Sequence, residues 1–301
     1  MSRLSTLPSA GKPDIIRSFE VTTPTDLLPF LSEKLPALKR TTLKQMLAHR
    51  QVRVNSNVTS RANQPLLPGS SVDVNLSREF REFNHRRLRI VFEDDDIIVI
   101  NKGYGLLSMA DDSGRERETA YSILRDYLKW AHSDNKLFIV HRLDRDTTGL
   151  MVFAKNLQAK EALQHNWNNM VLQRKYVCLV EGIPQPPEGT IRSRLAENSR
   201  HEVYSLPEDS TEGQLAVTRY RTLSSARGLS LVECELDTGR KNQIRVHMKQ
   251  LGTPISGDRR YGGHTSPMHR MCLHALTLRF VHPITRRDMH FTTPIPFRGF
   301  R

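Results

Sequence analysis

The 301-residue sequence predicts a mixed α/β protein, of the α+β type, with two domains of unequal size. Beyond a basic stretch at residues 78–89, apolar runs with strand composition alternate with amphipathic helical stretches. A shorter region with its own helix and strand patterns precedes that stretch. We therefore expect a loose arm over residues 1–20, a small domain over 21–84 and a large domain over 85–301. The strand-like runs are 97–100, 176–180, 229–236 and 273–280, and the helical stretches are near 119–130 and 157–170.

Composition and charge indicate a folded protein that contacts polyanions. The 45 Lys and Arg residues exceed the 32 Asp and Glu residues, which gives a net charge of +13 and a pI near 10.0. This surplus favours nucleic acid as the partner, with a basic protein that has no nucleic-acid role as the alternative. The three cysteines show neither the spacing of a zinc site nor a disulfide framework. No apolar run approaches the roughly 20 residues of a membrane helix, so we expect a cytoplasmic protein.

The region before residue 84 combines two helices with short strands. Apolar residues within 27–35 predict a first helix that ends near the following proline. Thr42 and Gln45 have the spacing of a capping box, which predicts that a second helix begins there. Alternating valines at 52–54 and 72–74 then predict two strands joined by a turn-rich segment.

This order of parts, with a basic helix running into the strand RQVRVN at residues 50–55, resembles the S-four-like RNA-binding domain. The resemblance implies that Lys44, Arg50 and Arg53 contact RNA. Gln51 and Ser56 stand where that family usually has glycine in a tighter turn. A helical cap without RNA contact is the alternative.

A charged loop interrupts two apolar strands in the large domain. The run HRLDRDTTGL at residues 141–150 has apolar residues immediately before and after it, which hold a loop rigid as a functional site requires. Asp144 lies between Arg142 and Arg145 in this run. Neighbouring cations favour an ionised carboxylate, which suits a nucleophile or a general base. A structural salt-bridge loop is the alternative.

A second polar loop follows the strand predicted at 229–236. The run TGR at residues 238–240 makes a turn, and Ile244, Met248 and Leu251 then recur at helical spacing. Arg245 lies on a different side of this helix from the apolar stripe, so it is free to reach a carboxylate. A bidentate pair with Arg245 would keep an aspartate ionised and oriented, although the sequence alone does not identify the partner as Asp144.

The run HRLDRDTTG at residues 141–149 resembles the signature of the RluA-type pseudouridine synthases. Several ordered blocks that agree are far more specific than any one of them. The departures from the family pattern, at Gly103, Thr148 and Asn242, are local and leave the aspartate intact. The further blocks, which span about residues 90–297, are INK at 100–102, RKY at 174–176, VEG at 180–182, GR at 239–240, QIRVH at 243–247, LHA at 273–275 and HP at 282–283.

This resemblance implies a pseudouridine synthase core, with a largely antiparallel central sheet flanked by helices, that isomerises uridine in RNA. It implies Asp144 as the catalytic carboxylate, Tyr176 as the aromatic that packs on the target base and Arg245 as the ion-pair partner of Asp144. The reaction detaches the sugar from the base nitrogen and rejoins it to carbon five of the uracil. We therefore expect no cofactor and no metal. Either Asp144 attacks the anomeric carbon or it removes a sugar proton.

The target nucleotide has to leave its stack to reach such a site. The resemblance implies that Arg142 fills the gap, because a planar guanidinium can stack in place of a base; a phosphate clamp is the alternative. Lys102, Arg240 and Lys241 are expected to contact the RNA backbone, since lysine and arginine mostly meet phosphate. The expected partner is structured RNA, ribosomal or transfer, bound by a monomer.

Other function classes compete with this interpretation. A catalytically silent RNA-binding or ribosome-assembly protein of the same fold would not need Asp144, Tyr176 and Arg245 together. A nucleoside or sugar hydrolase would use Asp144 and Asp146 as a carboxylate pair. A kinase-like catalytic loop is excluded because the glycine-rich loop and the Asp-Phe-Gly companion are absent from the sequence.

Overall fold

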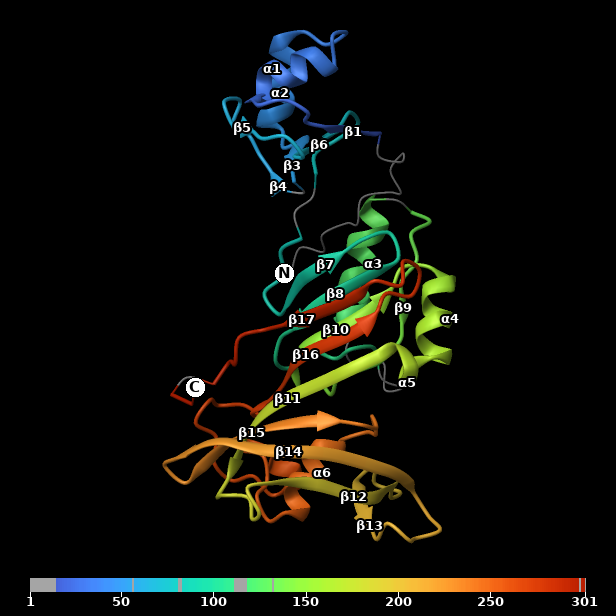
Figure 1. Cartoon of the computed structure of the whole chain (residues 1–301), viewed down its shortest axis with the longest axis vertical. Helices are drawn as coiled ribbons and strands as arrows, with labels where there is room; N and C mark the ends of the chain where they lie inside the picture. The colour runs from blue at the N-terminus through green and yellow to red at the C-terminus, as the bar shows by residue number, and fades with distance from the viewer. Residues whose placement is uncertain are drawn as a thin grey trace, which may run out of the picture. The chain divides into compact units, whose positions relative to one another are not determined.

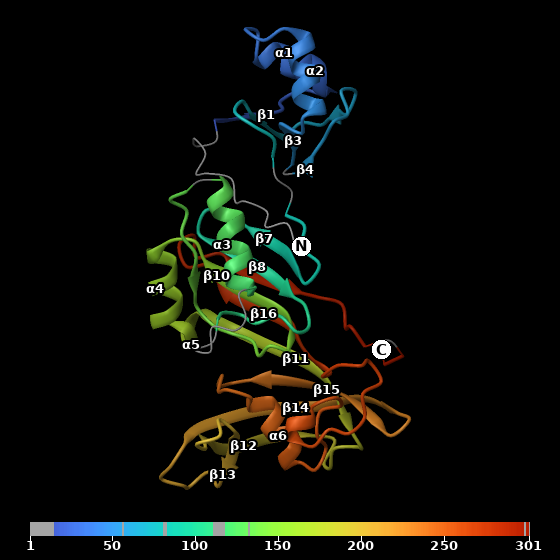
Figure 2. The ribbon, with the colours of Figure 1, turned by 180° about the vertical axis from the view of Figure 1, so that it is seen from behind.

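The computed structural model describes residues 15–55, 57–80, 83–110, 118–131, 133–297 and 299–300. The chain forms two compact units: Met1–Asn84 with Tyr127–Asn135, and His85–Asp126 with Lys136–Arg301. Figures 1 and 2 show the elements of each unit from opposite sides. In the described residues, no helix has the length and apolar character needed to cross a membrane.

The first unit combines a small antiparallel sheet, in the order β1-β6-β3-β4, with two helices. The inward residues of the helices and strands form one apolar core, which includes Leu31, Leu47 and Val74. A two-stranded pair, β2 and β5, closes one end. Its elements are β1 Ile16–Glu20, β2 Thr25–Asp26, α1 Leu27–Lys34, α2 Arg40–Ala48, β3 Val52–Val54, β4 Asn57–Val58, β5 Pro65–Leu66 and β6 Ser71–Asn75.

Three details of this unit differ from the sequence predictions. Ile16–Glu20, expected in a loose arm, forms a strand because its backbone pairs with β6, a contact remote in sequence; residues 1–14 of that arm lie outside the described residues. Helix α2 begins at Arg40 after Lys39 and has no side-chain cap, so the predicted capping box does not form. The unit also contains Tyr127–Asn135, where the rings of Tyr127 and Phe83 lie 5.2 Å apart.

The second unit is built on one sheet, which has eleven strands in the described part of the chain. The main path runs β13-β12-β14-β15-β11-β16-β10-β8-β7, with β17 beside β16 and β9 beside β10. The pairing of β10 with β16 is parallel, and the other pairings are antiparallel. The largely antiparallel sheet expected from the sequence is thereby confirmed. The strands are β7 Leu88–Glu93, β8 Ile97–Lys102, β9 Phe138–Ile139, β10 Thr148–Ala154, β11 Val171–Glu181, β12 Glu188–Glu197, β13 Val203–Leu206, β14 Gln214–Ala226, β15 Leu229–Leu236, β16 Leu273–Val281 and β17 Asp288–Thr292.

Helices flank this sheet. The helical stretch predicted at 157–170 is divided at Asn166, and the Asn156 side chain caps its first part by accepting a hydrogen bond from the Ala159 N–H. Helix α4 packs against β9 and β10, and α6 packs against β13 and β14 (Figures 1 and 2). The elements are α3 Ala120–Ala131, α4 Leu157–His165, α5 Trp167–Met170, α6 Gln243–Gln250 and the 3₁₀ turn η1 Arg259–Tyr261.

The register at Ala275 positions the centre of the second unit. Ala275 on β16 is the partner of Gly149 on β10 and also of Tyr176 on β11. The charged loop that precedes β10 is therefore held beside Tyr176. Gly149 has a φ of 112°, and a Cβ at that position would lie 2.2 Å from the Ala275 carbonyl oxygen, so the close approach of the two strands requires glycine.

Candidate active site

The loop that carries Asp144 joins β9 to β10 and has a tightly held backbone. The Thr147 N–H donates to the Asp144 carbonyl, at 3.2 Å, which closes a turn around the aspartate. The buried Ser108 hydroxyl accepts from the Leu143 N–H at 3.0 Å and donates to the Leu143 carbonyl at 2.7 Å. Both backbone groups of the residue before Asp144 are thereby fixed, which limits how far the carboxylate can move.

His141 anchors the start of the same loop. Its Nε2 accepts a hydrogen bond from the Val152 N–H of β10 at 3.0 Å. Burial, with a smaller effect of Arg174, lowers the pKa of His141 to about 3, so the imidazole is neutral at physiological pH. His141 is therefore a structural residue of the loop.

Arg245 on α6 bonds two aspartates at once. Its Nε and Nη2 donate to the two carboxylate oxygens of Asp258, at 2.7 and 2.8 Å, and its Nη1 donates to Asp144 at 3.2 Å. Burial alone would lower the pKa of Arg245, but the hydrogen bonds and charge of Asp258 and then of Asp144 raise it. The bidentate pair that the sequence suggested for Arg245 thus forms with Asp258, whose side chain is only 2% exposed.

Asn242 and Tyr261 complete the support of Arg245. Asn242 precedes α6 with a left-handed φ of 54°, a conformation that asparagine adopts more readily than most residues. Its Oδ1 accepts from Arg245 Nη1 at 2.9 Å, and its Nδ2 donates to the Tyr261 hydroxyl at 3.0 Å. The Tyr261 ring lies 4.8 Å from the Arg245 guanidinium carbon. Arg245 is therefore held on several sides by neutral and charged groups.

Gln243 pins the turn that precedes α6. Its side-chain oxygen accepts from the Thr238 hydroxyl and from the Arg240 N–H, and its side-chain nitrogen donates to the Val217 carbonyl and the Thr218 hydroxyl. Every hydrogen-bonding capacity of this buried amide is engaged between β14 and the turn. This satisfied network fixes the wall of the cleft opposite Asp144.

Tyr176 lies in a cleft with Asp144 and Arg245. Burial raises the pKa of Tyr176 to about 12, against a lowering effect of Arg174 and with a smaller raising effect of Asp144. The phenol is therefore neutral and offers a ring and a hydroxyl to the cleft. The cleft is lined by Arg142, Leu143, Asp144, Thr147, Tyr176, Leu236, Gly239, Arg240, Lys241, Asn242, Gln243, Ile244, Arg245 and Leu273.

The three cations expected to meet RNA at this cleft differ in their contacts. Arg142 is exposed at the cleft. Arg240 donates through Nε to the Leu215 carbonyl, and Lys241 is ion-paired with Glu197 at 2.6 Å. All three line the cleft, so their charge faces the space in which a substrate would bind.

Lys102 does not lie where the sequence analysis expected it. This lysine is 0% exposed, and its ammonium donates to the carbonyls of Gly103, Leu106 and Arg145. Burial lowers the pKa of Lys102 to about 7, with Asp146 and then Asp144 partly offsetting that effect. The expectation of an RNA phosphate contact is wrong for this residue, because a fully buried ammonium cannot reach phosphate. Lys102 instead ties β8 to the catalytic loop.

The basic residues predicted in the first unit also differ from one another. Lys44 is exposed on α2, and Arg50 is exposed just after it. Arg53 is already engaged, since its Nε bonds Asp73 at 2.7 Å and its guanidinium lies 4.6 Å from the centroid of the Phe80 ring. The structure thus gives Arg53 a role in holding this unit together.

The carboxylate pair required by a hydrolase does not share the cleft that Tyr176 lines. Asp146 lies with Asp144 in a neighbouring cavity, but it is not among the residues that line the cleft of Tyr176. Burial raises the pKa of Asp146, although Arg145, Arg245 and Lys102 oppose that shift. Asp144 is therefore the one of these two carboxylates that faces the aromatic cleft.

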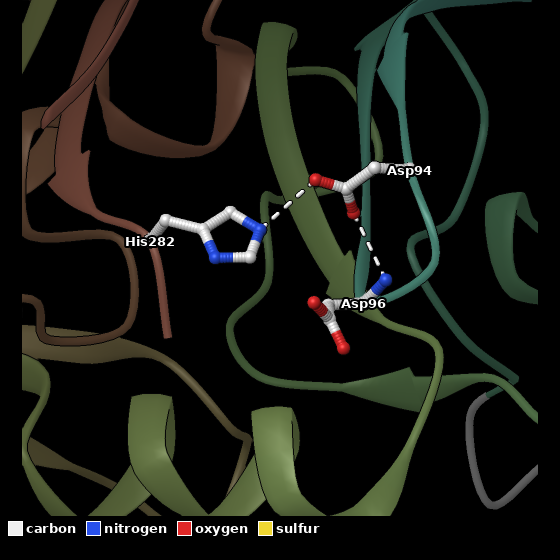
Figure 3. A group of neighbouring side chains, drawn as sticks. All are labelled: Asp94, Asp96 and His282. Atoms are coloured by element: carbon white, nitrogen blue, oxygen red, sulfur yellow. Dashed lines mark hydrogen bonds and ion pairs between the residues drawn. The ribbon is translucent and has the colours of Figure 1, made fainter. Parts of the chain in front are cut away.

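Asp94, Asp96 and His282 form the one cluster of potential metal ligands in the described residues, and their atoms are already bonded. His282 accepts at Nδ1 from the Ile284 and Thr285 N–H groups, so its proton lies on Nε2, which donates to Asp94 at 2.9 Å (Figure 3). The other Asp94 oxygen accepts from the Asp96 N–H, and Asp96 accepts from Asn156. These hydrogen bonds join the segment of Asp94 and Asp96 to the turn that follows His282, so we assign this cluster a structural role.

Sequence reasoning missed two residues of the site, Asp258 and Ser108. Asp258 lies in the run GDRRYG at 257–262, and an aspartate close after the helix that carries Arg245 was a usable signal. Ser108 follows the INK block with no pattern of its own. Its role depends on hydrogen bonds to the N–H and the carbonyl of Leu143, which lies more than thirty residues later in the chain.

Comparison with known proteins defines the class. A family model described as RNA pseudouridylate synthase matches residues 96–250, which is more than half of the chain. The chain belongs to this family, and it is an RNA pseudouridine synthase of the RluA type, an isomerase of uridine in RNA. The reaction class that the motif resemblance implied is confirmed.

Individual relatives cover most of the chain. Ribosomal large subunit pseudouridine synthase D of Haemophilus influenzae is 33% identical over 283 residues, covering 88% of this chain and 86% of that protein. The uncharacterized RNA pseudouridine synthase YhcT of Bacillus subtilis is 34% identical, with 84% of each chain covered. Among solved structures, human RNA pseudouridylate synthase domain containing 4 aligns with a TM-score of 0.57 and 26% identity, covering 69% of this chain and 88% of that one.

Lys102→Met is predicted to lower the free energy of unfolding by about 3 kcal/mol, because it leaves three buried carbonyls without their donor. Between a pH of about 7 and 10, Lys102 keeps its proton in the unfolded wild-type chain and has released it in the folded protein. The free energy of unfolding of the wild type therefore rises with pH over this range, relative to that of the variant. Urea unfolding across this pH range measures both effects. Lys249→Met, at an exposed position of the same unit, is the control, and parallel pH curves for wild type and Lys102→Met would contradict the prediction.

Proposed function

We propose that this RNA pseudouridine synthase uses Asp144 as its catalytic carboxylate, with Arg245 as the residue that orients it and Tyr176 as the surface on which the target uracil packs. The observation that carries the proposal is the 3.2 Å contact between the Asp144 carboxylate and Arg245 at the edge of the cleft that Tyr176 lines. Arg245 holds Asp144 with one donor and is itself fixed by Asp258. Asp144 therefore keeps lone pairs available for the sugar.

The chemistry of this arrangement suits departure of a uracil from a ribose. Arg245 orients the Asp144 carboxylate, which either attacks the anomeric carbon or takes a proton from the sugar. Tyr176, with its raised pKa, stays neutral and offers a flat face to the freed base as it rotates. Arg142, exposed at the mouth of the cleft, is placed to stack in the gap that the flipped nucleotide leaves.

The substrate we propose is ribosomal RNA of the large subunit. Several relatives that cover most of the chain carry the name ribosomal large subunit pseudouridine synthase D, and the surplus of positive charge supports a large polyanionic partner. We further propose that the first unit contacts this RNA through Lys44 and Arg50 and acts as an S-four-like domain.

Asp144→Asn is predicted to abolish tritium release from RNA labelled at uracil carbon five and to leave RNA affinity nearly unchanged, because it removes the reactive carboxylate and keeps the side-chain shape. Release is measured by charcoal assay and affinity by filter binding. Asp146→Asn is the matched control from the same loop, and it retains most of the release. Wild-type release by Asp144→Asn would refute the assignment.

Mapping of pseudouridines in total RNA from a strain that lacks this protein tests the substrate. We expect one or more sites in large-subunit ribosomal RNA to revert to uridine, and wild-type protein supplied to that RNA in vitro to restore them. Loss confined to transfer RNA would overturn the proposed substrate but leave the proposed catalytic residues standing.

Lys44→Gln combined with Arg50→Gln is predicted to weaken RNA binding and to reduce the slope of log affinity against log salt by about 0.7 to 0.9 per lost phosphate contact. Binding isotherms at several salt concentrations give the slope. Lys34→Gln, in the same unit and paired with Glu33, is the control. An unchanged slope in the double variant would show that these residues do not meet phosphate.

A further inference from the structure

A second pocket opens beside the catalytic cleft and shares a wall with it. Trp167, Asn168 and Arg174 line this pocket and not the cleft, whereas Arg142 and Tyr176 line both. The catalytic cleft and this neighbouring pocket are thus continuous across residues that we assign to the target nucleotide.

The charge of this pocket is wholly positive in the described residues. Its lining includes the guanidinium groups of Arg142, Arg174 and Arg240 and contains no carboxylate, and its one histidine, His141, is neutral. The pocket of Asp144 and Arg145 on the other side of the cleft contains three aspartates and so differs in kind. A ligand that carries negative charge fits the first of these pockets.

Arg174 is the strongest sign that a ligand binds here. In the described structure its one hydrogen bond is a long one, from Nη2 to the Leu236 carbonyl at 3.3 Å, and no carboxylate lies within ion-pair distance. The side chain is half-buried, and burial lowers its pKa. The charge of Asp237, beyond ion-pair distance, compensates this cation in part. A half-buried cation with no carboxylate in direct contact is still costly, and an acceptor-rich ligand would offset that cost. Gly239 leaves the space for the Arg174 guanidinium itself, since a Cβ at residue 239 would lie 2.5 Å from Arg174 Nη1.

Trp167 gives the pocket an aromatic wall that is held in place. The ring is half-buried at the start of α5, and His141 packs against it with ring centroids 4.8 Å apart. His141 is itself tied to the Val152 N–H, so the indole rests on a fixed support. The Arg174 guanidinium carbon lies 6.0 Å from the indole centroid. An aromatic ring, a guanidinium and the amide of Asn168 together match the faces and edges of a nucleobase.

The spacing along β11 relates this pocket to the target base. Arg174 and Tyr176 project from the same face of the strand, roughly 7 Å apart, whereas Gln173 and Lys175 bond Glu235 and Glu233 on the other face. Two binding positions this close lie within the reach of adjacent nucleotides on one chain.

We propose that this pocket binds a nucleotide adjacent to the target uridine, with its base against Trp167 and Arg174 and its phosphate at Arg240. The inference rests on the proposed function, in which Tyr176 packs on the target base. The enzyme thereby holds two neighbouring nucleotides out of the stack, and the second position contributes to the choice of substrate.

The test uses a short RNA fragment that spans the uridine found by the mapping described above, and versions in which the nucleotide on either side is abasic. For wild type, one of the two abasic fragments is expected to bind about tenfold more weakly, the loss typical of one stacked base. Trp167→Leu keeps an apolar contact for His141. This variant is expected to bind the intact fragment as weakly as wild type binds the affected abasic fragment, and its affinity should not change further when the nucleotide is abasic. Arg279→Gln, which loses an exposed pair with Asp288, is the control with wild-type behaviour.

A second measurement keeps the packing of Trp167 intact. The chain has two tryptophans, so Trp130→Phe leaves Trp167 as the only one, and Asp144→Asn in that background prevents turnover. The fluorescence of Trp167 should fall as the intact fragment saturates, but much less with the abasic fragment. Two results would refute the proposal that this pocket binds a nucleotide. One is unchanged fluorescence on saturation, and the other is a Trp167→Leu variant whose affinity is as sensitive to the abasic change as that of wild type. Tritium release by the Trp130→Phe protein, and its loss on addition of Asp144→Asn, separates that failure from a failure of the proposed function.

Discussion

The shared guanidinium of Arg245 is the interaction on which the site depends. It donates a bidentate pair of hydrogen bonds to the nearly inaccessible Asp258 carboxylate and one further hydrogen bond to Asp144. A largely buried arginine between two carboxylates costs little, because four of its five N–H donors are hydrogen-bonded, whereas loss of Asp258 would remove its main counter-charge. Asp258 thus positions Arg245, and the single bond to Asp144 is longer than the two bonds to Asp258.

The backbone of the loop that carries Asp144 is likewise held by buried hydrogen bonds. Ser108 and Lys102 bond backbone groups of the loop from strands and turns that lie early in the second unit, and His141 joins the loop to β10. These groups are buried, and their bonds replace those that a loop on the surface would make to water. The loop is therefore irregular in conformation but rigid, which is what positioning a carboxylate within a few tenths of an ångström requires.

Charge is divided across the site in a way that fits its proposed substrate. Carboxylates gather around Arg245, where they are paired, while the space on the Arg142 side of the cleft has arginines without carboxylate partners. An RNA chain would meet these cations first, with a base against the half-buried Arg174 and a phosphate at Arg240. The paired side would then hold the reacting sugar and base close to Asp144.

Much of the fold and the reaction class was predictable from local patterns. Strands β8, β15 and β16 are apolar enough to be found by composition, and Asp144 and Arg245 stand in runs whose order is specific to one family. The hairpin of β12 to β14 was not assigned, because its polar and charged residues alternate with small apolar ones and its conformation depends on pairing with β15. Strand β1 was missed for the same physical reason.

By itself the sequence determined the fold class and the reaction, and it singled out Asp144 as the candidate carboxylate, since these depend on residue types at short spacing. Only the tertiary structure decided which partner each charge has. It placed Lys102 inside the protein, gave the bidentate pair of Arg245 to Asp258 and brought Trp167 and Arg174 together beside Tyr176. Burial and long-range pairing set the energy of a charged side chain, and neither can be deduced from the residues next to it in the sequence.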